Sequence, residues 1–300
     1  MMDQPAGETR ILDGKKLSNL LLDEIRDAVQ KRAHKGLKTP HLAAILVGEN
    51  GASLSYVQSK IRMCEKTGIR STLMHLDENT SETELLQHIQ TMNSDADIDG
   101  FIVQLPLPAH LDPDKMIPAI DPDKDVDGFH PINLGRMQLG LPTFLSATPA
   151  GVMLLLERYA IETAGKHCVI LGRSNIVGTP LAILLSRNTE PGNCTVTLCH
   201  SKTKNIKEIC RTADILIAAL GRPHFVTADM VKAGAVIIDV GITRVPANNA
   251  KGYVVQGDVD FEQAAPIASA ITPVPGGVGP MTVVSLLLNT LQATEKKDNQ

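Results

Sequence analysis

The chain has 300 residues, of which 43% are hydrophobic and 21% charged, and its formal net charge is −4. This length allows two domains of ordinary size, each with a hydrophobic core. The small negative charge gives no reason to expect nucleic acid or an anionic membrane as a partner. Only 3% of the residues are aromatic and none is Trp, which argues against single-stranded nucleic acid as a ligand.

The N-terminal residues, the short apolar runs and the cysteines predict a cytoplasmic protein. The first residues lack the basic and apolar stretches of a secretory signal, and no apolar run is long enough to span a bilayer. The five cysteines are odd in number and form no C-x-x-C pair. We therefore expect buried thiols in a reducing compartment, with no disulfide and no metal site.

The first half of the chain predicts helices that alternate with strands. Apolar residues at helical spacing predict helices, and short continuous apolar runs predict strands. Thr80, followed by Glu84, is a capping signal for the third helix. The expected helices are 11–35, 53–67 and 80–92, and the expected strands are 42–47, 71–76 and 99–104.

Proline residues end this α/β layer. Residues 105–108 take the chain out of the sheet, because proline lacks the N–H group that a ladder needs. Two Asp-Pro pairs, at 112–113 and 121–122, bracket a short helix. Residues 121–144 form a long connection rich in Pro and Gly, and a helix that begins at Thr148 leads into a second domain.

Residues 168–185 carry the strongest local pattern of the second half. The apolar run Cys168–Leu171 ends at Gly172, a polar turn follows, and apolar residues continue to Leu185. This pattern predicts a strand, a tight turn and a helix whose N-terminus faces an anion such as a dinucleotide pyrophosphate. Ser174 stands where the G-x-G-x-x-G fingerprint has its second glycine, so an ordinary βα turn is the alternative.

Three further strands are expected at 194–199, 214–220 and 235–240. Strands that alternate with helices predict a Rossmann-type, doubly wound parallel sheet, which binds ligands at the carboxyl ends of its strands. A helix from 282 to 291 closes the predicted elements.

The residues after the second strand of this sheet favour NADP over NAD. NAD-binding sheets place a carboxylate there for the ribose hydroxyls, whereas this chain has His200, Ser201 and Lys202. The planar guanidinium of Arg173 can pair with a 2′-phosphate. The alternative for Arg173 and Lys202 is that both are ordinary solvated surface charges.

Four residues of the first half are candidates for chemistry. Tyr56 and Lys60 are spaced i, i+4 and therefore share a helix face, just past the carboxyl end of the first strand. Gln104 ends the third strand, and Asp127 lies in the loop that follows. Taken singly, each has a structural explanation: a solvated lysine, a half-buried tyrosine, a strand end and a turn aspartate.

Together with two later motifs, these residues closely resemble the bifunctional methylenetetrahydrofolate dehydrogenase/methenyltetrahydrofolate cyclohydrolase family, over nearly the whole chain. The resemblance implies two α/β domains with folate in a cleft between them. It also implies a cytoplasmic homodimer that uses NADP in one-carbon metabolism and purine biosynthesis. The motifs that carry it are S-Y-V-Q-S-K (55–60), V-Q-L-P-L-P (103–108), D-K-D-V-D-G (123–128), G-R-S (172–174) and T-P-V-P-G-G-V-G-P-M-T (272–282).

The resemblance also predicts the domain boundaries. Residues 1–148 are expected to form the folate-binding catalytic domain, completed by the C-terminal helix at about 280–300. Residues 149–279 are expected to form the Rossmann-type NADP-binding domain.

In this family the enzyme oxidises 5,10-methylenetetrahydrofolate to a methenyl cation and hydrolyses that to 10-formyltetrahydrofolate. Lys60 matches the catalytic lysine; a lysine that is neutral, or readily gives up its proton, favours formation of the cation and can act as a base for water. Gln104 matches the residue that orients the lysine, and Tyr56 the residue that stacks on folate. Asp127 matches the carboxylate that accepts the pterin N–H donors.

The resemblance further assigns residues to the cofactor and the closing loop. Gly172, Arg173 and Ser174 match the phosphate-binding turn, Ser201 a contact near the ribose phosphate, and Ile242 a residue near the nicotinamide. Four residues of the loop would allow backbone to approach substrate and cofactor, or would serve only to close the domain. They are Pro273, Gly276, Gly277 and Gly279.

Three alternatives to the bifunctional enzyme stay open at this point. The first is a dehydrogenase with little or no cyclohydrolase activity. The second is a non-catalytic NADP-binding regulator, which the intact set of four candidate residues disfavours. The third is another two-domain NADP dehydrogenase, such as one for shikimate-like hydroxy acids, which the loop at 272–282 disfavours.

Overall fold

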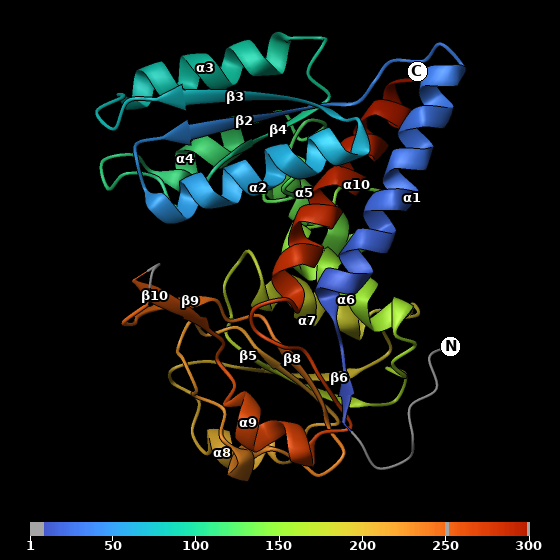
Figure 1. Cartoon of the computed structure of the whole chain (residues 1–300), viewed down its shortest axis with the longest axis vertical. Helices are drawn as coiled ribbons and strands as arrows, with labels where there is room; N and C mark the ends of the chain where they lie inside the picture. The colour runs from blue at the N-terminus through green and yellow to red at the C-terminus, as the bar shows by residue number, and fades with distance from the viewer. Residues whose placement is uncertain (1–8, 250–251, 299–300) are drawn as a thin grey trace. The chain divides into compact units, whose positions relative to one another are not determined.

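The computed structural model describes residues 9–249 and 252–298 (Figure 1). The chain forms two compact units. One consists of Asn19–Ala147 and the segment from Val283 onward, and the other of Thr148–Thr282 and the segment up to Ser18. Two long helices, α1 (Gly14–His34) and α10 (Val278–Asp298), therefore contribute residues to both units.

The unit of Asn19–Ala147 is built on a three-stranded parallel sheet in the order β3-β2-β4. Figure 1 shows α2 and α3 on opposite faces of this sheet. All seven residues of the central strand are buried, which explains why its sequence is a continuous apolar run. The elements are β2 (His41–Val47), α2 (Gly51–Thr67), β3 (Arg70–Leu76), α3 (Glu82–Ser94), β4 (Gly100–Val103), α4 (Pro113–Met116) and α5 (Pro131–Leu139).

The structure corrects the predicted start of the first helix and the predicted cap of the third. Arg10–Ile11 form a short strand, β1, so α1 begins only at Gly14. Ser81, not Thr80, caps α3: its hydroxyl accepts from Glu84 N, and the Glu84 carboxylate accepts from Ser81 N. The Thr80 hydroxyl instead donates to the Asp77 carbonyl.

The predicted connection at 121–144 also contains a helix, α5, which the sequence analysis did not predict. His130 caps the start of this helix, where its Nδ1 accepts a hydrogen bond from Ile132 N at 3.0 Å. Gly140 ends it in the left-handed conformation, with φ of 73°. Histidine is not among the usual capping residues, so the local sequence gave no clear start signal.

The second unit holds a six-stranded sheet in the order β1-β11-β8-β7-β5-β6, and all its pairings are parallel. The chain moves outward from β5 to β6 and then returns to β7 on the other side of β5. This reversal confirms the doubly wound topology and creates a switch point between β5 and β7. The strands are β5 (His167–Leu171), β6 (Thr195–Cys199), β7 (Ile215–Ala218), β8 (Val236–Asp239) and β11 (Ala270–Ile271).

Short helices and one hairpin complete this unit. The antiparallel hairpin of β9 (Thr243–Pro246) and β10 (Tyr253–Gln256) was not predicted. The helices are α6 (Ala147–Arg158), α7 (Gly178–Ser186), α8 (Ile206–Cys210) and α9 (Phe261–Ala264).

All five cysteine side chains of the chain are buried. Burial raises the pKa of the Cys64 thiol to about 12, and it also raises the pKa of Cys168. These thiols pack as small apolar side chains. Within the described ranges, no helix combines the length and apolar character needed to cross a membrane.

Candidate active site

Lys60 lies on α2, the helix that follows the carboxyl end of β2. Its side chain is largely buried, with 8% exposed, and its Nζ donates a hydrogen bond to Gln104 Oε1 at 3.1 Å. Gln104 directly follows β4, and its backbone N extends the ladder by donating to Ile45 O. Its side-chain Nε2 donates to Leu105 O at 2.6 Å, which leaves Oε1 turned toward the lysine.

Tyr56 lies one turn before Lys60 on α2, and 38% of its surface is exposed. An aromatic ring that is half out of the core offers a flat apolar face to a ligand. The expected common face of Tyr56 and Lys60 is thus present in a helix whose other side packs on the sheet.

Asp127 lies in a loop whose backbone is held at several points. A parallel bridge between Phe101 and Asp125 keeps the start of this loop beside β4, the strand that leads into Gln104. The Asp127 carbonyl accepts from Ala147 N at 3.2 Å. Among the described residues, none donates a hydrogen bond to the Asp127 carboxylate, so its oxygens remain available to a ligand.

The turn after β5 has the close backbone approaches of a dinucleotide-binding turn. Gly172 has φ of +112°, and a Cβ there would come within 2.2 Å of Ala219 O, at the end of β7. A Cβ on Gly178 would come within 2.0 Å of Gly172 O, so only glycine lets α7 start this close to β5. The Ser174 hydroxyl accepts from Val177 N at 3.1 Å and orders the turn, while Arg173 is exposed.

The residues after β6 lie directly beside this turn, because Gly172 N donates to Cys199 O at 2.9 Å. His200 Nδ1 accepts from Lys202 N, and Thr203 Oγ1 accepts from His200 N. This tight turn leaves Ser201 and Lys202 exposed. Ser201 and Lys202 therefore lie in the turn at the carboxyl end of β6, the strand that pairs with β5.

Ile242 and Gly279 lie close together in the same unit. Ile242 follows β8 and is 43% exposed, and a Cβ on Gly279 would lie 3.2 Å from its Cδ1. In the closing loop, a Cβ on Gly277 would meet Pro273 O at 2.6 Å. Gly276 has φ of +109°, and its carbonyl accepts from Lys15 N at 2.8 Å. The loop thus already favours glycine at two of these positions, by close packing at Gly277 and by the positive φ at Gly276.

Two models of one protein family match the chain: its catalytic domain matches residues 12–127, and its NAD(P)-binding domain matches residues 146–298. The chain belongs to the tetrahydrofolate dehydrogenase/cyclohydrolase family. The bifunctional protein FolD of Cytophaga hutchinsonii is 57% identical over 289 residues, which are 96% of this chain and 100% of that protein.

Two solved structures have the same architecture. The FolD methylenetetrahydrofolate dehydrogenase/cyclohydrolase of Campylobacter jejuni is 46% identical with a TM-score of 0.90, covering 96% of this chain and 99% of that one. The Trypanosoma brucei enzyme, complexed with NADP cofactor and inhibitor, is 35% identical with a TM-score of 0.92, covering 99% and 100%. These relationships confirm the predicted family, the two-domain α/β fold and the Rossmann-type NAD(P)-binding domain.

Two buried aspartates that the sequence analysis missed organise the NAD(P)-binding domain. Asp258 accepts hydrogen bonds from the backbone N–H groups of Leu220, Gly221 and Arg222, in the turn after β7. Asp239, at the end of β8, accepts from Gly241, Asp258 and Val259 N–H groups. Burial raises the pKa of the Asp239 carboxyl to about 6, against the opposing effect of these hydrogen bonds.

Ser53 is a further residue that the sequence analysis missed. It lies on α2, seven residues before Lys60, so two helical turns place both residues on one side of the helix. The hydroxyl is buried and has no hydrogen-bond partner among the described residues. A buried hydroxyl is costly to leave unsatisfied, so the packing of the described residues does not by itself explain a serine at this position. In the sequence, only its i, i+7 spacing from Lys60 sets Ser53 apart.

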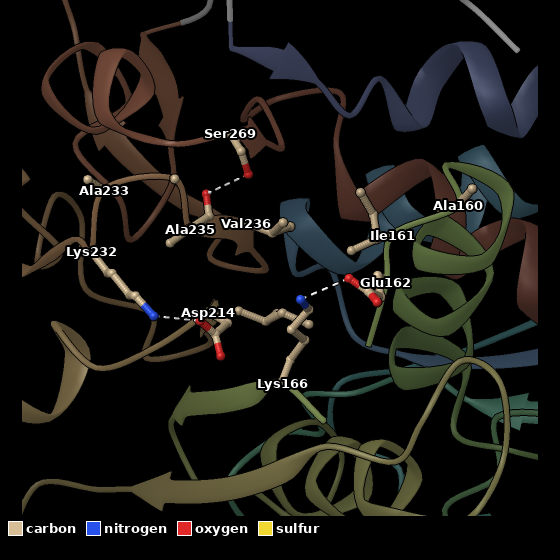
Figure 2. A pocket seen from close by; sticks show the side chains of 12 residues that line it. Ala160, Ile161, Glu162, Lys166, Asp214, Lys232, Ala233, Ala235, Val236 and Ser269 are labelled. Carbon is tan, nitrogen blue, oxygen red and sulfur yellow. Dashed lines mark hydrogen bonds and ion pairs between the residues drawn. The ribbon is translucent and has the colours of Figure 1, made fainter. Parts of the chain in front are cut away.

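A separate cavity of about 260 Å³ lies at the opposite edge of the Rossmann-type sheet (Figure 2). Its lining residues precede strands: Lys166 before β5, Asp214 before β7 and Ala235 before β8. The charged groups pair with each other, Lys166 with Glu162 at 2.8 Å and Lys232 with Asp214 at 2.6 Å. Because this sheet binds ligands at its carboxyl edge, the cavity is not the cofactor site.

Proposed function

We propose that Lys60, held by Gln104, is the group around which both reactions of the family are carried out. This enzyme oxidises 5,10-methylenetetrahydrofolate to 5,10-methenyltetrahydrofolate with NADP and hydrolyses the product to 10-formyltetrahydrofolate. The observation that supports the role of Lys60 is its buried Nζ, bonded at 3.1 Å to a glutamine that is itself fixed by Leu105 O.

In the first reaction the one-carbon bridge between N5 and N10 loses a hydride and becomes an amidinium cation. A positive charge on Lys60 would oppose this cation, whereas a neutral amine would not. Gln104 Oε1 accepts a hydrogen from Nζ in either protonation state, so it orients the amine without fixing its charge. When bound, NADP supplies the nicotinamide ring that accepts the hydride.

In the second reaction water adds to the methenyl carbon. Lys60 Nζ accepts one proton from the attacking water, so that a hydroxyl group joins the carbon. The carbon–N5 bond then breaks, the hydroxyl loses its proton to form the formyl group, and N5 gains a proton. The net release is one proton for each cation hydrolysed.

We propose that Tyr56 and Asp127 hold the folate. The exposed ring of Tyr56 would stack on the flat pterin or aminobenzoyl system. The Asp127 carboxylate would accept two N–H donors of the pterin, since its oxygens have no donor among the described residues. In the same proposal Pro273 and Gly277 bring backbone close to the substrate.

We also propose that NADP binds along the carboxyl edge of the second sheet. The residues present fit it: Gly172 and Gly178 allow the close backbone packing of a dinucleotide-binding turn, Arg173, Ser174 and Ser201 are exposed, and His200, Ser201 and Lys202 follow β6 where NAD-binding sheets have a carboxylate. Arg173 and Ser201 would hold the 2′-phosphate, which an NAD-type acidic residue would repel. Ile242 and Gly279 would lie near the nicotinamide.

The domain roles and the assembly are part of the same proposal. Residues 1–148, apart from the strand β1 that pairs in the second sheet and completed by the helix at about 280–300, would form the catalytic domain, and residues 149–279 the NADP-binding domain. Residues 1–8, 299 and 300 lie outside the described residues. We further propose that the enzyme works in the cytoplasm as a homodimer. Light scattering of the purified protein tests the assembly, and a monomer at micromolar concentration would contradict it.

A two-part assay tests the chemistry. Methylenetetrahydrofolate with NADP should yield NADPH, more slowly with NAD, and methenyl compound added separately should be hydrolysed faster than in buffer. Lys60→Met should remove the hydrolysis while NADP binding survives. Hydrolysis at the buffer rate by the unaltered enzyme would instead favour the dehydrogenase with little or no cyclohydrolase activity.

A further inference from the structure

Asn289 of the C-terminal helix makes a side-chain contact that nothing in the chemistry above requires. Its Nδ2 donates to Val126 O at 2.8 Å and to Leu145 O at 2.9 Å. An asparagine amide nitrogen carries two hydrogens, so both are used. The side chain is nearly buried, with 7% of the residue exposed.

The two carbonyls belong to two separate segments that meet around Asp127. Val126 immediately precedes Asp127, and Leu145 lies beyond the helix α5. The segments are in close contact, because a Cβ on Gly128 would come within 2.6 Å of Leu145 C. Asn289 therefore joins them at the residue next to the proposed folate-binding carboxylate.

Three consecutive carbonyls of this loop are held by partners distant in sequence. Val126 O accepts a hydrogen bond from Asn289 Nδ2, Asp127 O accepts from Ala147 N at 3.2 Å, and Gly128 O accepts from the Ser146 hydroxyl at 2.9 Å. Only the first of these bonds comes from the C-terminal helix. With the main chain fixed on both sides, the Asp127 side chain has a defined direction in which to meet a ligand.

We propose that Asn289 is a positioning residue for folate recognition: it fixes the Asp127 loop so that the carboxylate is set for the pterin before substrate arrives. This inference rests on the proposed role of Asp127. The Lys60–Gln104 pair comes from α2 and the end of β4, so it does not depend on Asn289. Loss of Asn289 should therefore weaken folate binding and leave the catalytic step largely unchanged.

The main experiment compares Asn289→Ala with Thr290→Val in the full-length enzyme. Thr290 is the next residue of the same helix, fully buried, and its hydroxyl donates only to Leu286 O within that helix. Asn289→Ala should raise the KM for methylenetetrahydrofolate about tenfold, with kcat and the KM for NADP changed less than about twofold. Thr290→Val should lower the melting temperature without changing the folate KM.

A double-mutant cycle separates positioning from general destabilisation. If Asn289 acts through Asp127, removing it from an Asp127→Ala enzyme should not weaken folate binding further. Additive losses would overturn the proposal, as would an equal rise of the KM values for folate and NADP. If Asn289→Ala does not fold, Asn289→Leu keeps a similar volume but removes both donors, and a folate KM unchanged from the parent would equally overturn the proposal.

The cycle also tells this inference apart from the assignment on which it rests. An Asp127→Ala enzyme with an unchanged folate KM would refute both the role of Asp127 and that of Asn289. A raised KM for Asp127→Ala with an unchanged KM for Asn289→Ala would refute the role of Asn289 alone.

Discussion

Gln104 presents its carbonyl oxygen to Lys60 Nζ because its own amide nitrogen is committed to the neighbouring Leu105 carbonyl. The orientation of the amide is thus set within the loop and does not depend on substrate. Preset orientation of this kind lowers the cost of reaching the reactive geometry.

Replacing Gln104 should therefore lower kcat more than it weakens substrate binding. Gln104→Leu keeps a similar volume but removes the acceptor, so Lys60 loses its orientation. We expect kcat for hydrolysis of the methenyl compound to fall about 10²-fold, in the range of a lost positioning or acid–base contribution. Steady-state kinetics with the separately added methenyl compound would show this, and an unchanged kcat would mean that the bond has no catalytic role.

Arg173→Ala should weaken NADP far more than NAD. A lost hydrogen bond to a charged group costs about 1.5–3 kcal/mol, which is roughly a 10- to 150-fold change in Kd. Titration calorimetry with both nucleotides measures the difference, and the nearby exposed Lys204→Ala serves as a control for general loss of positive charge. Equal weakening of both nucleotides would show that Arg173 does not contact the 2′-phosphate.

Gly178→Ala should destabilise the NAD(P)-binding domain strongly. The added methyl group would lie 2.0 Å from Gly172 O, and backbone on both sides would have to move. We expect a loss of about 2 kcal/mol or more in the free energy of unfolding.

Gly135→Ala is the matched control for that substitution. Gly135 lies on α5, and nothing is within 4 Å of its added Cβ. Alanine there should raise stability by about 0.5–1 kcal/mol, because it restricts the unfolded chain. Urea unfolding of both variants tests the pair, and similar stability losses would mean that the close approach at Gly178 has no special cost.

Asp239 should make the protein less stable as pH rises from about 4 to 6. Its folded-state pKa is raised by burial from 3.8 to about 6, so the folded state holds a proton that the unfolded state releases in this range. By linkage, a shift of this size removes up to about 3 kcal/mol as pH rises through that window, and the loss is complete above it.

The measurement is the unfolding free energy of the unaltered protein and of Asp239→Asn at pH 4 and pH 7. As pH rises from 4 to 7, the unaltered protein should lose stability relative to Asp239→Asn. Other carboxyls with lowered pKa, such as Asp97 and Asp99, act in the opposite direction in both proteins and cancel in the comparison. A difference that does not change with pH would contradict the assigned titration.

The sequence was sufficient for elements whose signal is local. The apolar run at β2 predicted a strand because that strand is buried on both faces, and Gly172 predicted the turn that its positive φ requires. Ser81 and Glu84 form the S/T-x-x-E capping box, so the correct cap of α3 was readable one residue beyond the one predicted.

Features that depend on distant partners could not be predicted. The two-residue strand β1 exists because it pairs with β11, about 260 residues later. Asn289 interrupts an apolar helix in the sequence, and only the fold shows that its amide meets Val126 and Leu145. Asp258 lies in an irregular segment, where a turn aspartate has no distinctive pattern.

The three N–H groups that donate to Asp258 are no longer available to a ligand in the turn after β7. Without the Asp258 carboxylate, the turn after β7 would leave the Leu220, Gly221 and Arg222 amides free to bind an anion. The carboxylate occupies these donors and adds a negative charge that repels phosphate. These donors are therefore already used within the domain, so in the NADP site proposed above the pyrophosphate would be anchored by the Gly172 turn and not by the turn after β7.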